Sequence, residues 1–197
     1  MSNNTANVTT GKPKVGGAVF TAPAGTTLPT SASAELNSAF VCVGYCSEDG
    51  LTNSNSPETS TVKAWGGDIV LVTESEKKDT FKFTMLEGMD PNALKAVYGD
   101  SNVSGDISTG ITVRANNALP VAHVWVFDML LTNNTPKRIV VPNAIVSGVD
   151  DIEYKDGDPV KYGITLTAMP GGESFGYDTH KEYIGPTGAT GATGATS

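Results

Sequence analysis

The chain has 197 residues, which is enough for one domain with a sizeable core. Its 22 glycines, 11 prolines and 39% hydrophobic residues are typical of strands, turns and loops and argue against a helical bundle. Thirteen Lys and Arg residues oppose 21 Asp and Glu residues, so the net charge is -8. This balance argues against tight nucleic-acid binding, and it fits either ordinary solubility or a surface along which a polyanion slides without sticking.

The first part of the chain predicts a flexible arm followed by two strands. Residues 1–15 are polar and lack both a charged leader and an apolar stretch, so we expect an arm and not a signal peptide. The apolar run 16–22 predicts a strand that ends at Pro23, and the alternating run 41–47 predicts another strand. Between them, residues 33–40 favour a short helical turn.

Cys42 and Cys46 are the two cysteines of the chain, and both lie in the second of these strands. Four residues of extended chain would separate their Cα atoms by about 13 Å, roughly twice what a disulfide spans. We therefore expect two reduced, half-buried thiols. The two histidines lie far away in the sequence and give no paired ligand spacing, so a metal site is not expected.

A long polar loop is predicted at residues 48–58. Its sequence, EDGLTNSNSPE, contains Asp-Gly and Ser-Pro pairs and one apolar residue, Leu51. A polar loop of this length in a compact β domain typically has a function or is partly disordered. It is therefore either a simple flexible loop or a segment that meets a partner.

A hairpin is predicted next, with strands at 68–73 and 80–87 around a charged turn at 74–79. In the second strand, apolar and polar side chains alternate. The apolar face of that strand carries Phe81, Phe83 and Met85.

One helix is predicted at about 90–98. Asp90 is a favourable N-cap, Pro91 suits the first helical position, and Gly99 suits the end. Leu94 and the residues three and four positions after it form one apolar stripe. We expect this helix to cover one face of a sheet.

The second half of the chain predicts a meander of antiparallel strands. The run 121–131 is apolar on both faces, which indicates a central strand, and His123 within it is expected to be a satisfied core residue. Strands at 138–145 and 160–169 follow, and Asp156-Gly157 is a strong hairpin signal.

The sequence offers one motif that is typical of an enzyme. Gly172-Glu173-Ser174-Phe175-Gly176 matches the G-x-S-x-G nucleophile elbow, which needs a helix after the serine and a triad acid and histidine further on. Only 21 residues remain after the motif, and His180 is the only histidine among them. The acidic cluster 150–158 lacks the EF-hand spacing and fits a solvated turn. We expect neither catalysis nor a cofactor.

The C-terminal residues 185–197 contain four Gly-X-Y triplets, GPT, GAT, GAT and GAT. Four triplets with one proline are too few for a collagen triple helix, so we expect a flexible tail. The domain between the arm and this tail spans residues 16–184. No stretch of the sequence approaches the roughly 20 apolar residues of a membrane span, and we expect folding in a cytoplasm.

Three segments between Val43 and Asp100 resemble a known family. They are GYCSEDGLTNSNSPET, TVKAWGGDIV and TFKFTMLEGMDPNALKAVYGD. Their order and spacing are similar to those of the major tail proteins, or tail-tube proteins, of long-tailed, non-contractile phages of Gram-positive bacteria. The resemblance covers about a third of the chain closely, and the later meander more loosely.

The resemblance implies a mainly β fold, a β-sandwich or half-barrel flanked by one helix. Copies of such a protein form hexameric rings that stack into a tube, and genome DNA passes through the lumen without specific binding. The implied partners are other copies of the chain and the tape-measure, tail-terminator and baseplate or tail-tip proteins, with no membrane. The implied location is the virion tail, and the host cytoplasm during assembly.

The resemblance also suggests two sets of functional residues. We expect the loop 48–58 to be a ring-to-ring contact that orders on assembly, with Leu51 as its apolar anchor. The candidate contact residues are Glu48, Asp49, Gly50, Leu51, Asn53 and Asn55. Three carboxylates, Glu74, Glu76 and Glu87, are candidates for a lumen face that repels DNA.

A different class of function remains open at this point. The Thr- and Asn-rich loops and the collagen-like tail also fit a β-sandwich surface protein, or a receptor- or glycan-binding module, that forms a small oligomer.

Overall fold

The computed structural model of the chain describes residues 3–171 and 176–185. The fold is mainly β with one helix, α1 (Pro91–Tyr98), as the sequence predicted. No helix in the described ranges is long and apolar enough to cross a membrane. The strands are β1 (Lys12–Pro13), β2 (Val19–Pro23), β3 (Val41–Cys42), β4 (Thr52–Lys63), β5 (Ile69–Met85), β6 (Val103–Ser104), β7 (Thr112–Val113), β8 (His123–Leu130), β9 (Pro136–Val149), β10 (Tyr162–Ala168) and β11 (Lys181–Ile184).

Nine strands form one antiparallel sheet with the order β3-β2-β8-β9-β10-β5-β4. The short strand β1 pairs with β8, and β11 pairs with β9, so the end of the expected arm 1–15 belongs to the sheet. Strands β8, β9 and β10 follow one another in both chain and sheet, which confirms the predicted meander. The middle of β8 is buried on both faces, as its unbroken apolar run predicted.

The large sheet is bent into a half-barrel. Phe81 on β5 and Phe127 on β8 stack with their ring centroids 5.6 Å apart, although β9 and β10 lie between these strands. On a flat sheet, three strand spacings would hold the two side chains about 14 Å apart. Phe83 and Trp125 meet in the same way at 5.7 Å. The aromatic rings on the concave side therefore close the core, and the half-barrel expectation is confirmed.

Helix α1 begins and ends where its capping residues predicted. The Asp90 carboxylate accepts a hydrogen bond from the backbone N–H of Asn92 at 3.0 Å, and Gly99 ends the helix with a φ of 91°. Ala93 and Leu94 are buried against the concave core. The helix thus covers that face of the sheet, as expected.

A buried ion pair lies on the other face of the sheet. The Arg138 guanidinium donates to both carboxylate oxygens of Asp128, at 2.6 and 2.8 Å, and to the carbonyl oxygens of Ala34 at 2.6 Å and Ser31 at 3.2 Å. The predicted helical turn at 33–40 is not formed. Its nearby carbonyls bond to Arg138 instead of to N–H groups four residues later.

The largest departure from the sequence prediction is the hairpin of β4 and β5. These strands pair along their length, from the pair Thr52 and Lys82 at one end to the pair Lys63 and Ile69 at the other. The predicted loop 48–58 is therefore wrong from Thr52 onward, and the predicted turn 74–79 lies inside β5. The chain turns at Gly66-Gly67, where both residues have positive φ. Thr, Ser and Asn residues suggested a loop, but backbone pairing along a solvated edge strand needs no apolar side chains.

The predicted strand 41–47 is mostly irregular. Strand β3 covers only Val41–Cys42, because the chain bends at Gly44, whose φ is 83°. Cys42 and Cys46 are free, half-buried thiols, as expected. Burial raises the pKa of the Cys46 thiol to about 11, which keeps it protonated and unreactive at neutral pH.

Candidate assembly surface

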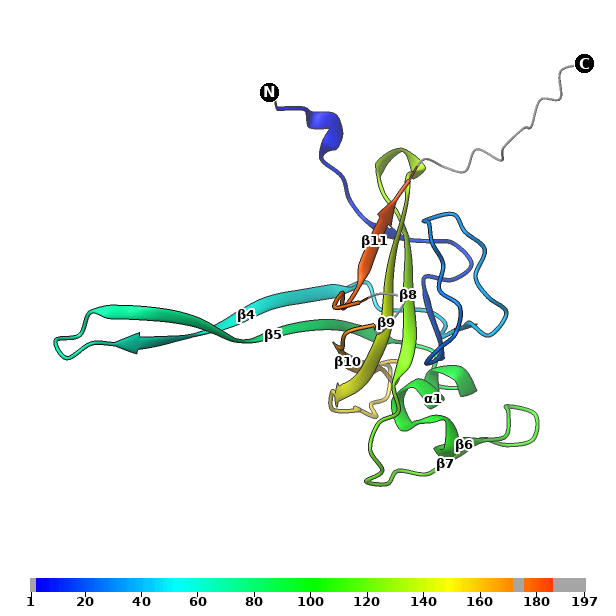
Figure 1. Cartoon of the computed structure of the whole chain (residues 1–197). Helices are drawn as coiled ribbons and strands as arrows, with labels where there is room; N and C mark the ends of the chain where they lie inside the picture. Colours follow the sequence, from blue (N-terminus) through cyan, green and yellow to red (C-terminus); the bar gives the residue numbers. More distant parts are fainter. Residues whose placement is uncertain (1–2, 172–175, 186–197) are drawn as a thin grey trace, which may run out of the picture.

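The β4–β5 hairpin leaves the body of the molecule as a long ribbon (Figure 1). Strand β10 pairs with β5 only between Thr80 and Met85, so the body supports the hairpin at its base alone. Beyond this base, about ten residues of each strand continue outward, which corresponds to roughly 33 Å. Every residue of β4 is exposed.

The outer end of this ribbon is apolar on both faces. We call residues 61–72 the hairpin tip. Val62 pairs with Leu71, and Thr61 pairs with Val72, so these neighbouring pairs point to opposite faces of the ribbon. Six large apolar side chains at the tip are about half exposed or more: Val62, Trp65, Ile69, Val70, Leu71 and Val72. A contiguous exposed apolar cluster of this kind marks an interaction site.

The base of the hairpin is held by a buried carboxylate. Asp79 is 2% exposed, and it accepts hydrogen bonds from the Asn53 Nδ2 at 2.8 Å and from the Thr179 Oγ1 and His180 Nδ1, each at 2.5 Å. The His180 ring also meets the edge of Phe81, with centroids 5.3 Å apart. Asp79 therefore ties both strands of the hairpin to the segment that precedes β11.

The same contacts set the charges of this pair. Burial alone would raise the pKa of Asp79, but the hydrogen bonds from His180, Thr179 and Asn53 lower it overall. The bond to Asp79 in turn raises the pKa of His180, against the opposing effect of burial. Both shifts favour the ion pair, which stiffens the point at which the ribbon leaves the body.

The ribbon also has open edges. Strand β4 is the last strand of the sheet, and β5 pairs only with β4 between Ile69 and Asp79 within the described residues. Unpaired backbone N–H and C=O groups along such edges can pair with a strand of another chain. Pro57 is tolerated in β4 because an edge strand needs fewer ladder bonds.

The structure does not gather the predicted contact residues into one exposed loop. Leu51 packs against the core of its own chain. Asn53 bonds to Asp79 at the hairpin base, while Asn55 lies exposed on β4. Only residues 48–51 remain outside regular structure, and among them are Glu48, Asp49 and Gly50. A role of these residues in assembly stays a prediction.

The three predicted lumen carboxylates also lie apart. Glu74 and Glu76 lie on the projecting part of β5, where their backbones pair with Thr59 and Glu58. Glu87 lies past the other end of β5, and its carboxylate accepts a hydrogen bond from the backbone N–H of Tyr45 at 2.7 Å. From Glu76 to Met85 the chain stays in the single strand β5, so nine residue steps, or about 30 Å, separate Glu76 from the end of the strand beside Glu87. One subunit therefore does not bring the three carboxylates together.

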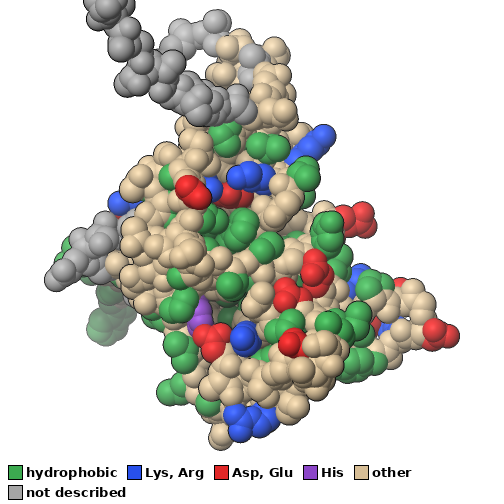
Figure 2. Space-filling model, turned by 90° about the vertical axis from the view of Figure 1, so that its right-hand side faces the viewer, with side chains coloured by type: hydrophobic (Ala, Val, Ile, Leu, Met, Phe, Trp, Pro, Cys, Tyr) green, Lys and Arg blue, Asp and Glu red, His purple; other side chains and the backbone are tan. Residues whose placement is uncertain are grey.

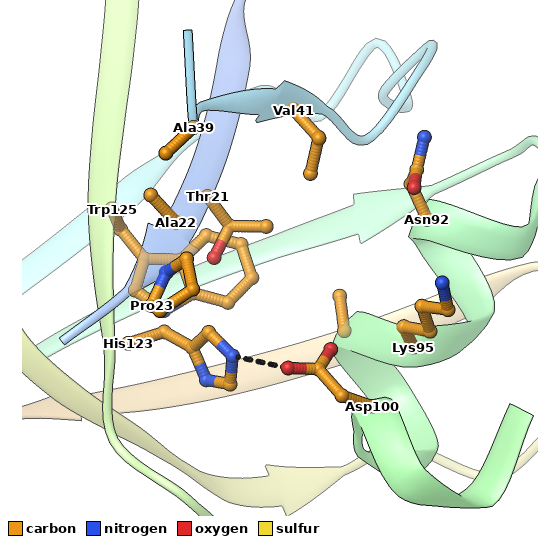
Figure 3. A pocket seen from close by; sticks show the side chains of 11 residues that line it. Thr21, Ala22, Pro23, Ala39, Val41, Asn92, Lys95, Asp100, His123 and Trp125 are labelled. Carbon is orange, nitrogen blue, oxygen red and sulfur yellow. Dashed lines mark hydrogen bonds and ion pairs between the residues drawn. The ribbon is translucent and has the colours of Figure 1, made fainter. Parts of the chain in front are cut away.

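A pocket of about 260 Å³ lies at the opposite edge of the sheet from the hairpin. One wall comes from β2 and β8, and the other comes from α1 and the turn after it (Figure 3). The Asp100 carboxylate lies 3.1 Å from the His123 Nε2 at its lower side. The pocket is lined by Thr21, Ala22, Pro23, Ala39, Val41, Asn92, Lys95, Ala96, Asp100, His123 and Trp125.

Sequence reasoning missed both the hairpin tip and this pocket. The sequence signal for the tip was the pair of mainly apolar runs that flank the turn Trp65-Gly66-Gly67, at 62–64 and 69–72. The pocket had no local signal, because its walls come from segments up to about a hundred residues apart. His123 was expected to be a satisfied core residue. Both of its ring nitrogens have partners, the Val121 carbonyl and the Asp100 carboxylate, but its side chain is partly exposed in this pocket.

The described residues hold no group of three metal-binding side chains. Ser174 of the elbow motif lies outside the described residues, and so do residues 186–197 of the predicted tail.

Comparison with known families agrees with the resemblance in the sequence. The family model described as phage tail tube protein matches residues 1–178. No curated protein matches the chain. The family match includes the hairpin, the helix and the meander, and it extends well beyond the segments that first suggested it. The chain therefore belongs to the phage tail tube protein family and is a structural subunit of the tail of a virion.

Proposed function

We propose that copies of this chain assemble into hexameric rings that stack into a tube, and that the β4–β5 hairpin reaches from each subunit to a neighbour. The observation that carries this proposal is the hairpin tip, which exposes large apolar side chains on both faces of a two-stranded ribbon. Such a ribbon is at best marginally stable in water. Contact with another subunit would bury both faces at once.

The energy available from this contact is large. Fully burying one large apolar side chain stabilises by about 1.5–3 kcal/mol, and six such side chains lie at the tip. Part of this gain is lost to the ordering of side chains and the docking of whole subunits. A repeated contact of this size still favours a polymer over free subunits.

The hairpin takes over the role that the sequence suggested for the loop 48–58. Strand β4 continues directly from residues 48–51, and the proposed apolar anchor is the tip around Trp65, outside the predicted loop, in place of Leu51. Residues 48–51 lie near the hairpin base and form a further candidate for the ring-to-ring contact.

The proposed lumen conducts genome DNA into the host. A net charge of -8 for each subunit would repel the phosphates and keep DNA from adhering. Glu74 and Glu76 on the hairpin are the predicted lumen carboxylates, and Glu87 is a less favourable candidate because it caps a backbone N–H. The proposed partners are the tape-measure, tail-terminator and baseplate or tail-tip proteins. The host is proposed to be Gram-positive, with assembly in its cytoplasm and no enzymatic role.

A shortened hairpin tests the assembly role. Replacing residues 57–77 with Asn-Gly would join Ser56 to Lys78 through a tight hairpin turn. The variant keeps Asn53 and Asp79, so we expect a folded monomer with the melting temperature of the native chain and no tubes by negative-stain electron microscopy. The matched control is Tyr177→Ser, which removes an exposed aromatic side chain elsewhere and should assemble normally.

Tubes of normal appearance from the shortened variant would refute the role of the hairpin. Discrete small particles from the native chain, in place of tubes or rings, would favour the receptor- or glycan-binding module instead.

Charge reversal tests the lumen. A phage that carries Glu74→Lys and Glu76→Lys should form tails of normal length but eject DNA poorly, because cations at the wall bind phosphates. The control is Asp151→Lys with Glu153→Lys, which makes the same change in charge at an exposed turn of the body. Unchanged infectivity of the hairpin variant would remove these carboxylates from the lumen.

A further inference from the structure

We propose that the hairpin tip of one subunit inserts the Trp65 side chain into the pocket between β2, β3 and α1 of a second copy of the chain. The inference rests on the proposed function and names the surface that receives the hairpin. Trp65 is fully exposed at the end of the ribbon, and Gly66-Gly67 beside it let the chain turn away without a side chain in the path.

The positions of tip and pocket suit a repeated contact. The sheet begins at β3 and β2, which carry the pocket, and ends at β5 and β4, which carry the tip. Figure 1 shows α1 on the far side of β8 and β9 from the projecting hairpin. A subunit that gives its tip to one neighbour and receives the tip of another in its pocket makes heterologous contacts, which generate rings or helical polymers.

The size of the pocket fits an indole ring. A cavity of about 150 Å³ holds a benzene ring, so 260 Å³ has room for the two fused rings of Trp65. Much of the wall is apolar, and Figure 3 shows Ala22 and Pro23 beside the Trp125 ring, with Ala39 and Val41 above them. Aromatic side chains that fill such pockets are common energetic centres of protein interfaces.

Two polar atoms in the pocket wall also lack partners. Among the described residues, the Thr21 Oγ1 and the Trp125 Nε1 are buried and form no hydrogen bond. Buried polar atoms without partners are rare, and each costs about 1–3 kcal/mol. A docked tip offers both partners after a small shift of the wall. The Trp65 indole N–H can donate to the Thr21 hydroxyl, and the Gly66 carbonyl can accept from Trp125.

The tip and the pocket each carry one basic and one acidic side chain, so opposite charges can meet across the contact. Lys63 and Asp68 flank the turn of the hairpin, with Ala64 N–H bonded to the Asp68 carbonyl at 2.8 Å. Lys95 and Asp100 stand at the α1 side of the pocket. One cation and one anion on each surface allow Lys63 to approach Asp100 while Asp68 approaches Lys95. The view in Figure 2, toward the side away from the hairpin, shows hydrophobic side chains mixed with acidic and basic ones.

Photo-crosslinking tests the contact directly. The variant Trp65→p-benzoylphenylalanine keeps an aromatic group at the tip, and it should form intersubunit crosslinks on irradiation of assembled protein. Mass spectrometry should place these crosslinks at residues 21–23, 39–41 or 92–96. Crosslinks confined to other parts of the chain would overturn the inference.

Filling the pocket gives a second test. Ala96 is half-buried on the α1 wall, and Ala96→Trp should occupy the pocket from within the same chain. We expect the dissociation constant between subunits to rise by about 30-fold or more, as for loss of an interface hot spot. The matched control is Ala118→Trp, which adds the same side chain at an exposed position and should assemble normally. Melting curves show whether each variant is folded.

Mixing two variants separates this inference from the proposed function. Trp65→Ser lacks the tip anchor but keeps the pocket, while Ala96→Trp keeps the tip but lacks the pocket. Each alone should stay mainly monomeric at a concentration at which the native chain assembles. The mixture should form one-to-one complexes that grow no further, as measured by analytical ultracentrifugation. Normal assembly of Ala96→Trp alone would overturn the docking site and leave the hairpin role standing. Normal assembly of Trp65→Ser would overturn the anchor itself.

A charge exchange tests the same contact when a filled pocket disturbs folding. Lys95→Glu should weaken assembly by placing an anion opposite Asp68. Adding Asp68→Lys should restore it, because the pair is then present with reversed signs. If the double variant assembles no better than the single one, these two residues do not meet.

Discussion

Asp128 and Arg138 form the most deeply buried charged contact among the described residues. Their side chains are 4% and 2% exposed, and two parallel hydrogen bonds join them. The third guanidinium nitrogen of Arg138, Nη1, donates hydrogen bonds to the carbonyl oxygens of Ser31 and Ala34. Arg138 on β9 therefore positions the irregular segment between β2 and β3. That segment contributes Ala39 to the pocket wall, which links this pair to the proposed docking site.

Breaking this pair from one side should be costly. We expect Arg138→Met to lower the free energy of unfolding by about 3–5 kcal/mol, because Asp128 then stays buried with no cation beside it except the half-exposed Lys14. Urea unfolding measures the loss. The double variant with Asp128→Leu should recover most of it, since no charge is left to desolvate.

Lys14→Ala is the matched control for this prediction. Lys14 lies 3.6 Å from Asp128 but is half exposed, so its removal should change stability by less than about 1 kcal/mol. A loss of this small size for Arg138→Met would mean that the buried pair does not matter for stability.

The ion pair of Asp79 and His180 predicts a dependence on pH. His180 has a raised pKa, so its contribution is complete below the ordinary histidine value and disappears as the pH rises through the raised value. Asp79 has a lowered pKa, so its contribution is complete above the ordinary aspartate value and disappears as the pH falls through the lowered value. The pair therefore stabilises most between about pH 4 and about pH 6.5.

We expect the free energy of unfolding of the native chain to fall as the pH rises above the ordinary histidine value and through the raised pKa of His180. The decrease should be smaller in His180→Gln, which keeps a hydrogen-bond donor but does not titrate. His123→Gln serves as the control and should leave the decrease in place. An equal decrease in native chain and His180→Gln would assign it to other groups.

At the scale of elements, the helix and the hairpin differ in what stabilises them. Helix α1 has its own capping residues and an apolar stripe, so local sequence alone was enough to predict it. Strand β4 has neither an apolar face nor a favourable alternation, and it exists because the backbone of β5 is available beside it. Its pairing joins residues up to thirty positions apart, which a local pattern does not reveal.

This difference predicts unequal hydrogen exchange. In the free subunit, backbone amides in the projecting part of the hairpin, between its base at Asp79 and the turn at Gly66-Gly67, should exchange quickly. An isolated two-stranded ribbon opens easily. Amides of β8 and β9 in the sheet centre should be protected, and they serve as the internal control. In assembled tubes the tip should become protected as well. Equal protection of the tip in both states would mean that assembly does not cover it.

At the scale of the whole molecule, the net charge of -8 opposes assembly. Like charges on approaching subunits repel over about 30 Å at 0.01 M salt and about 10 Å at 0.1 M salt. Close pairs at a docked interface are screened less than this long-range repulsion.

Assembly should therefore be faster at higher ionic strength. Light scattering at about 0.02 M and about 0.2 M salt would measure the rate of tube formation. The variant Asp151→Asn with Glu153→Gln removes two exposed charges from the body and should show a smaller dependence on salt. A rate that falls as salt is added would mean that attraction between charged patches dominates.

The sequence by itself determined the class of fold, the helix and its caps, the central strand, the meander and the family. Each of these depends on side-chain patterns within a few residues, such as Asp90-Pro91 at a helix start or the apolar run of β8. Tertiary structure alone decided the length of the β4–β5 hairpin, the bend that brings Phe81 to Phe127, and the pocket beside α1. These features depend on backbone pairing and on contacts between distant segments. The proposed contact between tip and pocket belongs to this second group, because it joins residues that only the folded chain places at opposite edges of one sheet.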